Sequence, residues 1–226
     1  LAVILTILAP DFRRSGVSTD DSILSSLSLM QDMTFKSFTL RQDEPLSAEA
    51  RESLKDALRR CQSYAEQPED WLALTGDYGC GKTHLAAAIA NHRTELGQPA
   101  FFVVVPDLLD HLRATFSPAS QVRFDKRFET VRTAPLLVLD DLGTESASPW
   151  AQEKLFQLFN HRYNARLPTV ITTAQPVKEL DPRLRTRMGD RRRCTYLLIK
   201  APSYRGAGHE QTTSKARTRG GADGQS

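Results

Sequence analysis

Five short apolar runs occur along the chain, separated by polar and turn-forming residues. They are WLALT (71–75), AFFVVV (100–105), LLVLD (136–140), TVITT (169–173) and CTYLLI (194–199). AFFVVV has no apolar–polar alternation, and LLVLD is apolar up to its last residue, which indicates strands buried on both faces. The pattern predicts five strands, some of them inside a sheet that is covered on both sides.

Helical periodicity fills the intervals between these runs. Over 45–67 apolar residues recur at helical spacing, which predicts an amphipathic helix. They are Ala50, Leu54, Ala57, Leu58 and Cys61, with Ser47 as the expected N-cap. Further helices are expected over 82–96 (stopped by Gly97), 106–116 (opened by Pro106), 120–132 and 149–167 (capped by Ser148). Strands that alternate with helices predict an α/β fold with a parallel sheet between two helical layers.

The two ends of the chain lack this alternation. Residues 1–34 are interpreted as an N-terminal arm or linker, or as the end of a longer upstream region. Their apolar start, LAVILTILAP, is too short to cross a bilayer and has no basic residue before it, so neither a membrane anchor nor a signal peptide is expected. Residues 205–226 are polar, rich in glycine and without periodicity, which predicts a disordered tail.

Composition narrows the class of protein only moderately. The 226 residues suit one domain, and 40% hydrophobic and 25% charged residues are globular values. A net charge of +3 permits a nucleic-acid partner without requiring one. Cys61, Cys80 and Cys194 form no CxxC pair, so we expect free thiols, no zinc site and a cytoplasmic protein.

The stretch GDYGCGKTH carries the clearest chemistry. Gly76, Gly81, Lys82 and Thr83 match G-x-x-x-x-G-K-[ST] between a predicted strand and a predicted helix. Backbone N–H groups of such a loop face a phosphate, the lysine reaches the β- and γ-phosphates, and the hydroxyl binds Mg²⁺. The candidate ATP-binding residues here are Gly76, Asp77, Tyr78, Gly79, Cys80, Gly81, Lys82, Thr83 and His84. Cys80 is interpreted as a small loop side chain rather than a reactive thiol.

An acidic pair supplies the second half of a magnesium site. LLVLD ends in Asp140, and Asp141 follows. Asp140 is the expected ligand of Mg²⁺ through water, together with Thr83, and Asp141 is expected to orient or deprotonate the attacking water. Two aspartates that merely cap a turn are the structural alternative, which the upstream P-loop disfavours.

A late arginine box is the third element. Arg183, Arg185 and Arg187 alternate in DPRLRTRM after the fourth predicted strand. Such a run is commonly a solvated helix end. In a ring ATPase, however, an arginine at this place projects into the neighbouring site and stabilises charge on the γ-phosphate, which is the arginine-finger role.

In order and spacing these motifs resemble AAA+ ATPases, and GKTHLA followed by LDDLG resembles the DnaC/DnaI helicase loaders and the IstB transposition helpers. The match covers Thr34 to Tyr204, so 35–204 is interpreted as one AAA+ domain. The resemblance implies a P-loop NTPase fold, three layers αβα, with strand order 5-1-4-3-2 and no substantial lid after CTYLLIKAPSY. Phe38, within MTFKSF, matches an aromatic segment that lies near the adenine.

The resemblance also implies an activity and partners. It implies that ATP and Mg²⁺ are bound between subunits of a homo-oligomer and that the protein binds single-stranded DNA. It also implies that the protein delivers a replicative ring helicase. By position Arg187 corresponds to the finger and Arg183 to its companion. A transposition helper, which polymerises on duplex DNA and activates a transposase, is the alternative. A P-loop small-molecule kinase is a third possibility, but no basic lid is evident.

Two departures from the family pattern point to slow ATP hydrolysis. The polar sensor expected at the tip of the fourth strand is replaced by Ala174, for which Thr173 or Gln175 are the possible substitutes. The catalytic carboxylate is Asp141 rather than the longer Glu of many AAA+ proteins. We therefore expect an ATPase that is slow and stimulated by DNA or a partner.

Basic clusters are the candidate DNA contacts. They are Arg123, Lys126, Arg127 and Arg132 in one predicted helix, and Arg191, Arg192 and Arg193 near the last strand. Clusters of this kind neutralise phosphates and make binding depend on salt rather than on base sequence. Interspersed acids such as Asp125 and Glu129 also fit an ordinary solvated surface.

Overall fold

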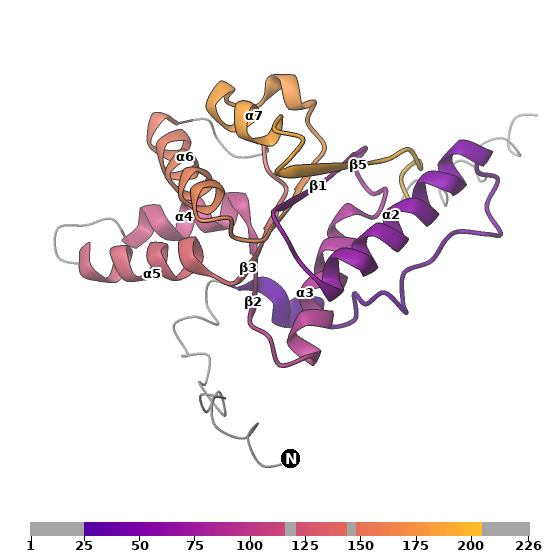
Figure 1. The fold of residues 1–226 in the computed structure, drawn as a ribbon, viewed down its shortest axis with the longest axis horizontal. Helices are drawn as coiled ribbons and strands as arrows, with labels where there is room; N and C mark the ends of the chain where they lie inside the picture. Colours follow the sequence, from indigo (N-terminus) through magenta and orange to yellow (C-terminus); the bar gives the residue numbers. More distant parts are fainter. Residues whose placement is uncertain (1–24, 116–120, 144–147, 205–226) are drawn as a thin grey trace, which may run out of the picture.

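A five-stranded parallel sheet forms the centre of the computed structural model, which describes residues 25–115, 121–143 and 148–204 (Figure 1). The strands are β1 (Trp71–Gly76), β2 (Ala100–Val104), β3 (Leu136–Asp140), β4 (Thr169–Thr173) and β5 (Cys194–Ile199). All neighbours pair in parallel, in the order β2-β3-β4-β1-β5. The predicted order 5-1-4-3-2 is confirmed. Residues 1–24 of the arm expected over 1–34, and the whole of the tail expected over 205–226, lie outside the described residues.

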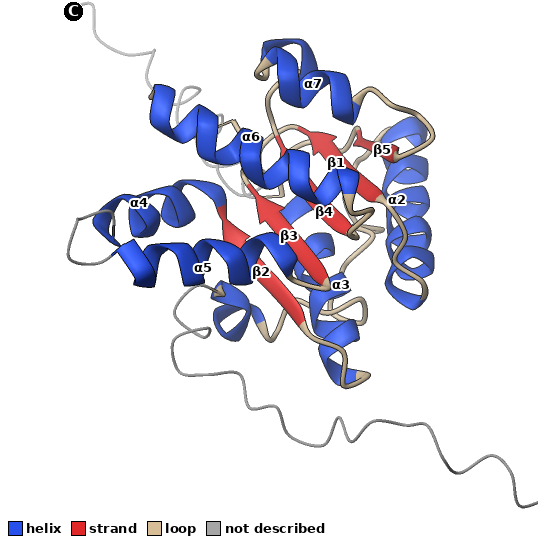
Figure 2. Cartoon of the chain, turned by 60° about the vertical axis from the view of Figure 1, so that its left-hand side comes forward, coloured by secondary structure: helices blue, strands red, loops and turns tan. Residues whose placement is uncertain are grey.

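Helices cover both faces of the sheet, so the three-layer prediction is also confirmed (Figure 2). α2 (Ala48–Glu66) and α3 (Lys82–Glu95) lie on one face. α4 (Val105–Thr115), α5 (Gln121–Thr133) and α6 (Pro149–Asn164) lie on the other. Neighbouring residues of β3 belong to opposite cores, because Leu137 packs with the second group of helices and Val138 with the first.

The helix ends follow the local chemistry of the sequence. Ser47 Oγ accepts from the Ala50 N–H at 3.1 Å, and Ser148 Oγ accepts from the Ala151 N–H at 3.2 Å, which confirms both predicted caps. α4 begins at Val105 rather than at Pro106, so β2 is one residue shorter than predicted. A proline fits here because its missing N–H has no partner to lose in the first turn.

A short helix completes the second face. η2 (Val177–Glu179), a 3-10 turn, leads into α7 (Pro182–Met188), which lies against α6 (Figure 1). Leu184 and Met188 of α7 are buried in the core of this face. Between β5 and Tyr204, the last described residue, the chain forms no further helix. In the described ranges no helix combines the length and the apolar character that crossing a membrane requires.

The segment that precedes α2 lies along the sheet and α3. η1 (Ser26–Met30) is a 3-10 turn, and Ser25 Oγ accepts from the Phe102 N–H of β2 at 3.2 Å. Asn91 on α3 donates from Nδ2 to the carbonyls of Met30 and Met33, at 2.8 and 2.9 Å. Residues 25–34 thus contact the domain closely, while the domain boundary placed after residue 34 stays a prediction.

Candidate nucleotide-binding site

The carboxyl ends of three strands meet at one edge of the sheet. Thr75 of β1 pairs with Thr173 of β4, and Leu139 of β3 pairs with Ile171. Asp140, the last residue of β3, therefore lies next to Thr172 of β4, beside the loop that follows β1. In parallel α/β sheets ligands bind at this edge.

The loop between β1 and α3 takes the conformation expected of a phosphate cradle. Gly76, Gly79 and Gly81 have φ values of +140°, +76° and +107°, a region that side chains with a Cβ rarely adopt. At Gly76 a Cβ would collide with the Ile199 carbonyl oxygen. Gly81 is the N-cap of α3 and has no side chain to cap its N–H groups. The N-terminus of α3 thus presents backbone N–H groups and positive dipole charge to the loop.

Lys82 lies inside this loop. Lys82 is only 5% exposed, and its Nζ donates to the carbonyls of Gly76 and Asp77 at 2.9 and 2.8 Å. Its Nζ also lies 5.7 Å from the centre of the Tyr78 ring. These bonds hold the ammonium group at the centre of the cradle, where a phosphate would meet it.

Asp140, Thr83 and Thr172 form a buried cluster beside the cradle. Asp140 is 2% exposed; its Oδ1 accepts from Thr172 Oγ1 at 2.6 Å and from Thr83 Oγ1 at 3.1 Å. Burial raises the pKa of Asp140 to about 6; the Asp141 charge adds to this, and the two hydroxyls and Lys82 oppose it. A carboxylate and a hydroxyl are the hard oxygen donors that Mg²⁺ prefers, so Asp140 and Thr83 fit this metal.

Asp141 takes an unusual backbone conformation. Its φ is +57°, a left-handed value that costs energy for a residue other than glycine, and its N–H donates to Thr172 Oγ1 at 3.0 Å. This turn directs the Asp141 side chain into the same cavity that Lys82 and Asp140 line. The predicted acidic pair is therefore brought to the P-loop.

One cavity of about 720 Å³ joins these groups, a volume in the range of ligand sites. Ten of the site residues predicted from the sequence line this cavity: Phe38, Tyr78, Gly79, Cys80, Gly81, Lys82, Thr83, His84, Asp140 and Asp141. Gly76 and Asp77 contribute to it through the carbonyls that hold Lys82. Burial raises the pKa of the Cys80 thiol, which agrees with the interpretation of this residue as an unreactive loop side chain.

An aromatic and a histidine connect the N-terminal segment to the P-loop. A Cβ at Gly81 would lie 3.0 Å from the Phe38 ring, and this ring packs edge-on against His84 with centroids 5.3 Å apart. His84 Nε2 lies 2.9 Å from the Thr34 carbonyl and 3.4 Å from Ser37 Oγ. His84 thus contacts the segment that forms one wall of the cavity.

The lining also contains residues that the sequence motifs did not indicate. The Tyr204 N–H donates to the Gly79 carbonyl at 2.9 Å, and Arg41, 6% exposed, donates from Nη1 to the Pro202 carbonyl at 2.5 Å. Arg41 also pairs with Glu44. No local signal marks these residues, since the contacts join segments that are far apart in sequence. The lining is completed by Met30, Met33, Ser37, Thr39, Leu54, Val104 and Ser203.

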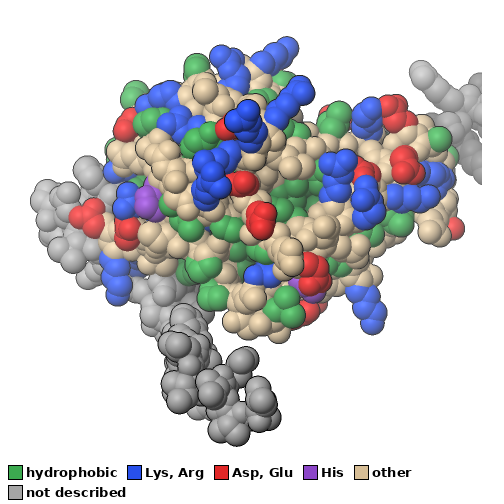
Figure 3. All heavy atoms as spheres, viewed as in Figure 1, with side chains coloured by type: hydrophobic (Ala, Val, Ile, Leu, Met, Phe, Trp, Pro, Cys, Tyr) green, Lys and Arg blue, Asp and Glu red, His purple; other side chains and the backbone are tan. Residues whose placement is uncertain are grey.

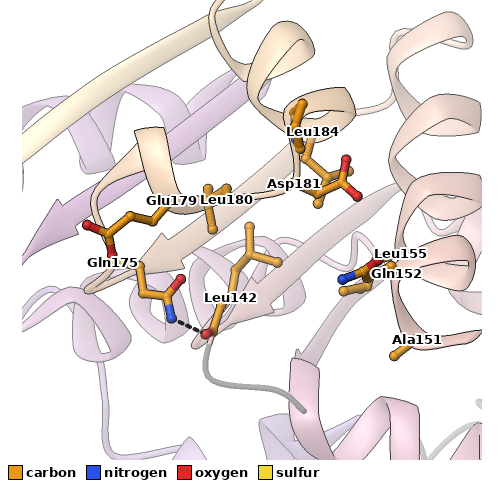
Figure 4. A pocket seen from close by; sticks show the side chains of 11 residues that line it. Leu142, Ala151, Gln152, Leu155, Gln175, Glu179, Leu180, Asp181 and Leu184 are labelled. Atoms are coloured by element: carbon orange, nitrogen blue, oxygen red, sulfur yellow. Dashed lines mark hydrogen bonds between the residues drawn. The ribbon is translucent and has the colours of Figure 1, made fainter. Parts of the chain in front are cut away.

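The sensor substitutes expected near Ala174 do not reach the carboxylates. Thr173 Oγ1 donates to the Leu142 carbonyl at 2.7 Å. Gln175 donates to the Gly143 carbonyl and lines a second cavity of about 490 Å³ between the end of β3, α6 and α7 (Figure 4). Thr172, which was not among the expected substitutes, is the β4 side chain that contacts Asp140. Successive side chains along a strand point to opposite faces of the sheet, so Thr172 and Thr173 have different contacts.

The arginine box lies on α7, away from this cavity. Arg187 donates from Nη1 to the Arg183 carbonyl at 2.9 Å and from Nη2 to Asn160 Oδ1. Arg183 pairs with Glu153 at 3.1 Å and with Asp181 at 3.2 Å. Neither arginine lines the nucleotide cavity of its own chain. The two were expected to act on a neighbouring protomer, and their placement on a separate surface is compatible with that prediction.

The basic clusters predicted to contact DNA differ in exposure. Lys and Arg side chains gather over α7 at the top of the molecule in Figure 3. Arg191 and Arg192 are exposed, whereas Arg193 is half-buried, with its guanidinium 4.9 Å from the centre of the Tyr163 ring. In the other cluster Lys126 is exposed and Arg132 pairs with Glu129 at 2.5 Å. The side chain of Arg123 lies outside the described part of the chain.

Comparison with known proteins identifies the family. The family model described as "IstB-like ATP binding protein" matches residues 19–212, most of the chain. This chain belongs to that family. The strand order and the P-loop are thus those of an ATP-binding AAA+ protein, as predicted.

Two of the proteins with similar sequences are named as replicative helicase loaders. The chain is 29% identical over 157 residues to "Replicative helicase loader DnaI" of Bacillus subtilis, covering 67% of this chain and 48% of that protein. It is 26% identical over 160 residues to "Replicative helicase loader DnaC" of Escherichia coli, covering 68% and 65%. The chain therefore spans about half to two thirds of the length of these relatives. A crystal structure of "the DnaC helicase loader" matches with TM-score 0.55 and 26% identity, over 76% of this chain and 99% of that one.

Proposed function

We propose that this chain binds and slowly hydrolyses ATP, and that it acts as a replicative helicase loader. The observation that supports this most directly is the convergence of Lys82, Thr83, Asp140 and Asp141 on one cavity beside the N-terminus of α3. A helix N-terminus and a buried lysine bind phosphate, and an acidic pair next to a threonine hydroxyl suits phosphoryl transfer with a metal ion.

The chain's own residues have separable roles in this proposal. Lys82 leaves the Gly76 and Asp77 carbonyls and binds the β- and γ-phosphates, while the backbone of the loop and Phe38 hold the rest of ATP. Thr83 and Asp140 hold Mg²⁺, which when bound neutralises charge on the phosphates. Asp141 orients the attacking water. Because Asp140 has a pKa of about 6, it is mostly ionised at pH 7.

The site is completed by a second copy of the chain. Arg187 lies outside its own cavity, and within the described ranges it forms no ion pair with a carboxylate. A half-buried guanidinium without a neutralising acid suits an anion brought by another molecule. We assign that anion as the γ-phosphate in an adjoining protomer, which makes ATP the agent that holds a homo-oligomer together.

DNA and helicase binding rest on the relatives. Two proteins named replicative helicase loaders match the chain, and the exposed Arg191 and Arg192 provide positive charge for single-stranded DNA. The IstB-like family model favours a second candidate, an ATP-dependent transposition helper that acts on duplex DNA and a transposase. Family membership gives no support to the third possibility, a small-molecule kinase.

A pull-down distinguishes the first two candidates. The tagged chain, with ATP and Mg²⁺, is incubated separately with the replicative helicase and with the transposase of its own organism. We expect the helicase to be retained, retention to be lost in Lys82→Ala, and retention to persist in Lys178→Ala, which changes an exposed lysine on η2. Retention of the transposase alone would favour the second candidate.

Hydrolysis is measured in the same preparations. Steady-state ATP turnover should be slow for the chain alone and should rise when single-stranded DNA or the helicase is added. Fast turnover without either would contradict the proposal of a slow, partner-stimulated ATPase.

A further inference from the structure

A stripe of three α6 side chains holds Arg187. Phe156, Asn160 and Tyr163 are spaced by four and three residues, so they lie along one face of the helix. The Arg187 guanidinium carbon lies 4.8 Å from the centre of the Phe156 ring and 5.9 Å from that of Tyr163. Between these rings, Asn160 Oδ1 accepts from Nη2 of Arg187. The side chain of Arg187 is thereby aligned with α6.

The hydrogen bonds leave part of the guanidinium available. An arginine has five N–H groups: one on Nε and two on each Nη. One N–H of Nη1 donates to the Arg183 carbonyl and one of Nη2 to Asn160. The Nε of Arg187 is buried and has no partner among the described residues. One N–H on each Nη is left without a partner among the described residues, so the guanidinium can still donate to an oxyanion.

The chemistry of the acceptors separates Arg187 from its neighbour. Arg183 stacks on the same Phe156 ring at 4.3 Å, but it also pairs with Glu153 and Asp181, so its charge is balanced. Arg187 is held by an amide oxygen and a carbonyl oxygen, which are both neutral. A neutral acceptor fixes the direction of the guanidinium without cancelling its charge, and a fixed side chain loses less rotamer freedom when it binds.

We propose that Asn160 is a positioning residue for Arg187: it holds the guanidinium in the orientation that meets the γ-phosphate of the neighbouring protomer and leaves its positive charge intact. This inference rests on the proposed intersubunit role of Arg187. Asn160 itself does not touch ATP in this arrangement. Its effect is on the rate of hydrolysis in the assembled protein and not on the affinity of a protomer for nucleotide.

The test compares variants of the full chain in ATP hydrolysis, with DNA added to promote assembly. Asn160→Ala should lower kcat roughly tenfold, as expected for the loss of one hydrogen bond to a charged group, and should leave the affinity for ATP unchanged. Asn160→Asp keeps the shape and the acceptor but adds a negative charge, so it should lower kcat at least as far. Asn164→Ala is the matched control, because Asn164 is an exposed residue one turn further along α6.

A double variant separates positioning from a general effect on the fold. If Asn160 acts through Arg187, Asn160→Ala should cause no further loss in an Arg187→Ala background. A further tenfold loss there would overturn the inference. So would wild-type kcat in both Asn160 variants while Arg187→Ala is impaired, and the proposed function would then stand. Wild-type kcat in Arg187→Ala would remove the intersubunit role itself, and this inference with it.

Discussion

The hydroxyl of Thr172 on β4 donates a 2.6 Å hydrogen bond to Oδ1 of Asp140 on β3. The same hydroxyl oxygen accepts from the Asp141 N–H at 3.0 Å. One β4 side chain therefore contacts both members of the acidic pair, and it stabilises the left-handed turn at Asp141. The geometry of the two carboxylates depends on the strand next to them as well as on their own.

Thr172→Val should impair hydrolysis without preventing ATP binding. Valine keeps the shape but removes the hydroxyl, so Asp140 and the Asp141 N–H each lose a partner. We expect kcat to fall about tenfold and the free energy of unfolding to fall by about 1–3 kcal/mol, the range for buried groups left without a partner. Turnover assays and denaturant titration measure the two effects. The control is Thr195→Val, an exposed threonine on β5, and equal behaviour of the two variants would contradict the prediction.

The raised pKa of Asp140 predicts a pH dependence of stability. Asp140 has a pKa of about 6 in the folded protein, whereas in the unfolded chain it loses its proton near the ordinary aspartate pKa of 3.8. The folded state therefore binds more protons between these values, and stability decreases as the pH rises through this window. When the pH falls from 7 to 5, the free energy of unfolding of the wild type should increase by about 1 kcal/mol relative to that of Asp140→Asn, because the asparagine cannot titrate.

Urea titrations of the two proteins at pH 5, 6, 7 and 8, without nucleotide or metal, test this sign. Other titrating groups are common to both proteins, so the difference isolates Asp140. If the difference in unfolding free energy between the two proteins does not change with pH, burial does not perturb the pKa of this carboxyl group.

Arg187→Ala should separate binding from turnover. Because Arg187 does not line its own cavity, the affinity for ATP should stay within about twofold of the wild type, whereas kcat should fall by about 10³-fold or more, as for other arginine fingers. Arg185→Ala is the control on the same helix, since Arg185 is exposed and donates to the Lys178 carbonyl at 3.0 Å. Nucleotide titration, turnover and sedimentation with ATP provide the readouts. An unchanged rate would exclude the finger.

His84→Ala should weaken ATP binding through the wall of the cavity. His84 joins the P-loop helix to the Thr34 carbonyl and packs against Phe38, so its loss frees the segment that closes this side. We expect the Kd for ATP to rise about fivefold to tenfold, equal to about 1–1.4 kcal/mol, the size of one hydrogen bond. Proteolysis before α2 should also become faster. His111→Ala, an exposed histidine on α4, should do neither.

Local signals were enough to predict most of the fold. Five apolar runs became the five strands, and Ser47 and Ser148 became caps, because strand burial and helix capping depend on neighbouring residues. The P-loop and the acidic pair were recognisable for the same reason: phosphate binding needs glycines, a lysine and a hydroxyl within one short stretch. Errors at this level were small, such as the start of α4 one residue before Pro106.

Contacts between distant segments were decided only by the tertiary structure. Arg162, fully buried, donates to the carbonyls of Arg132, Ala134 and Pro168 and to Thr169, a role that no pattern around it indicates. The contacts of Thr172 with Asp140, of Tyr204 with Gly79 and of Asn160 with Arg187 are of the same kind. The sequence by itself determined which elements form and which one carries the phosphate loop, because those properties are local. Strand register and helix packing determined which side chains meet, since a shift of one residue turns a strand side chain to the other face.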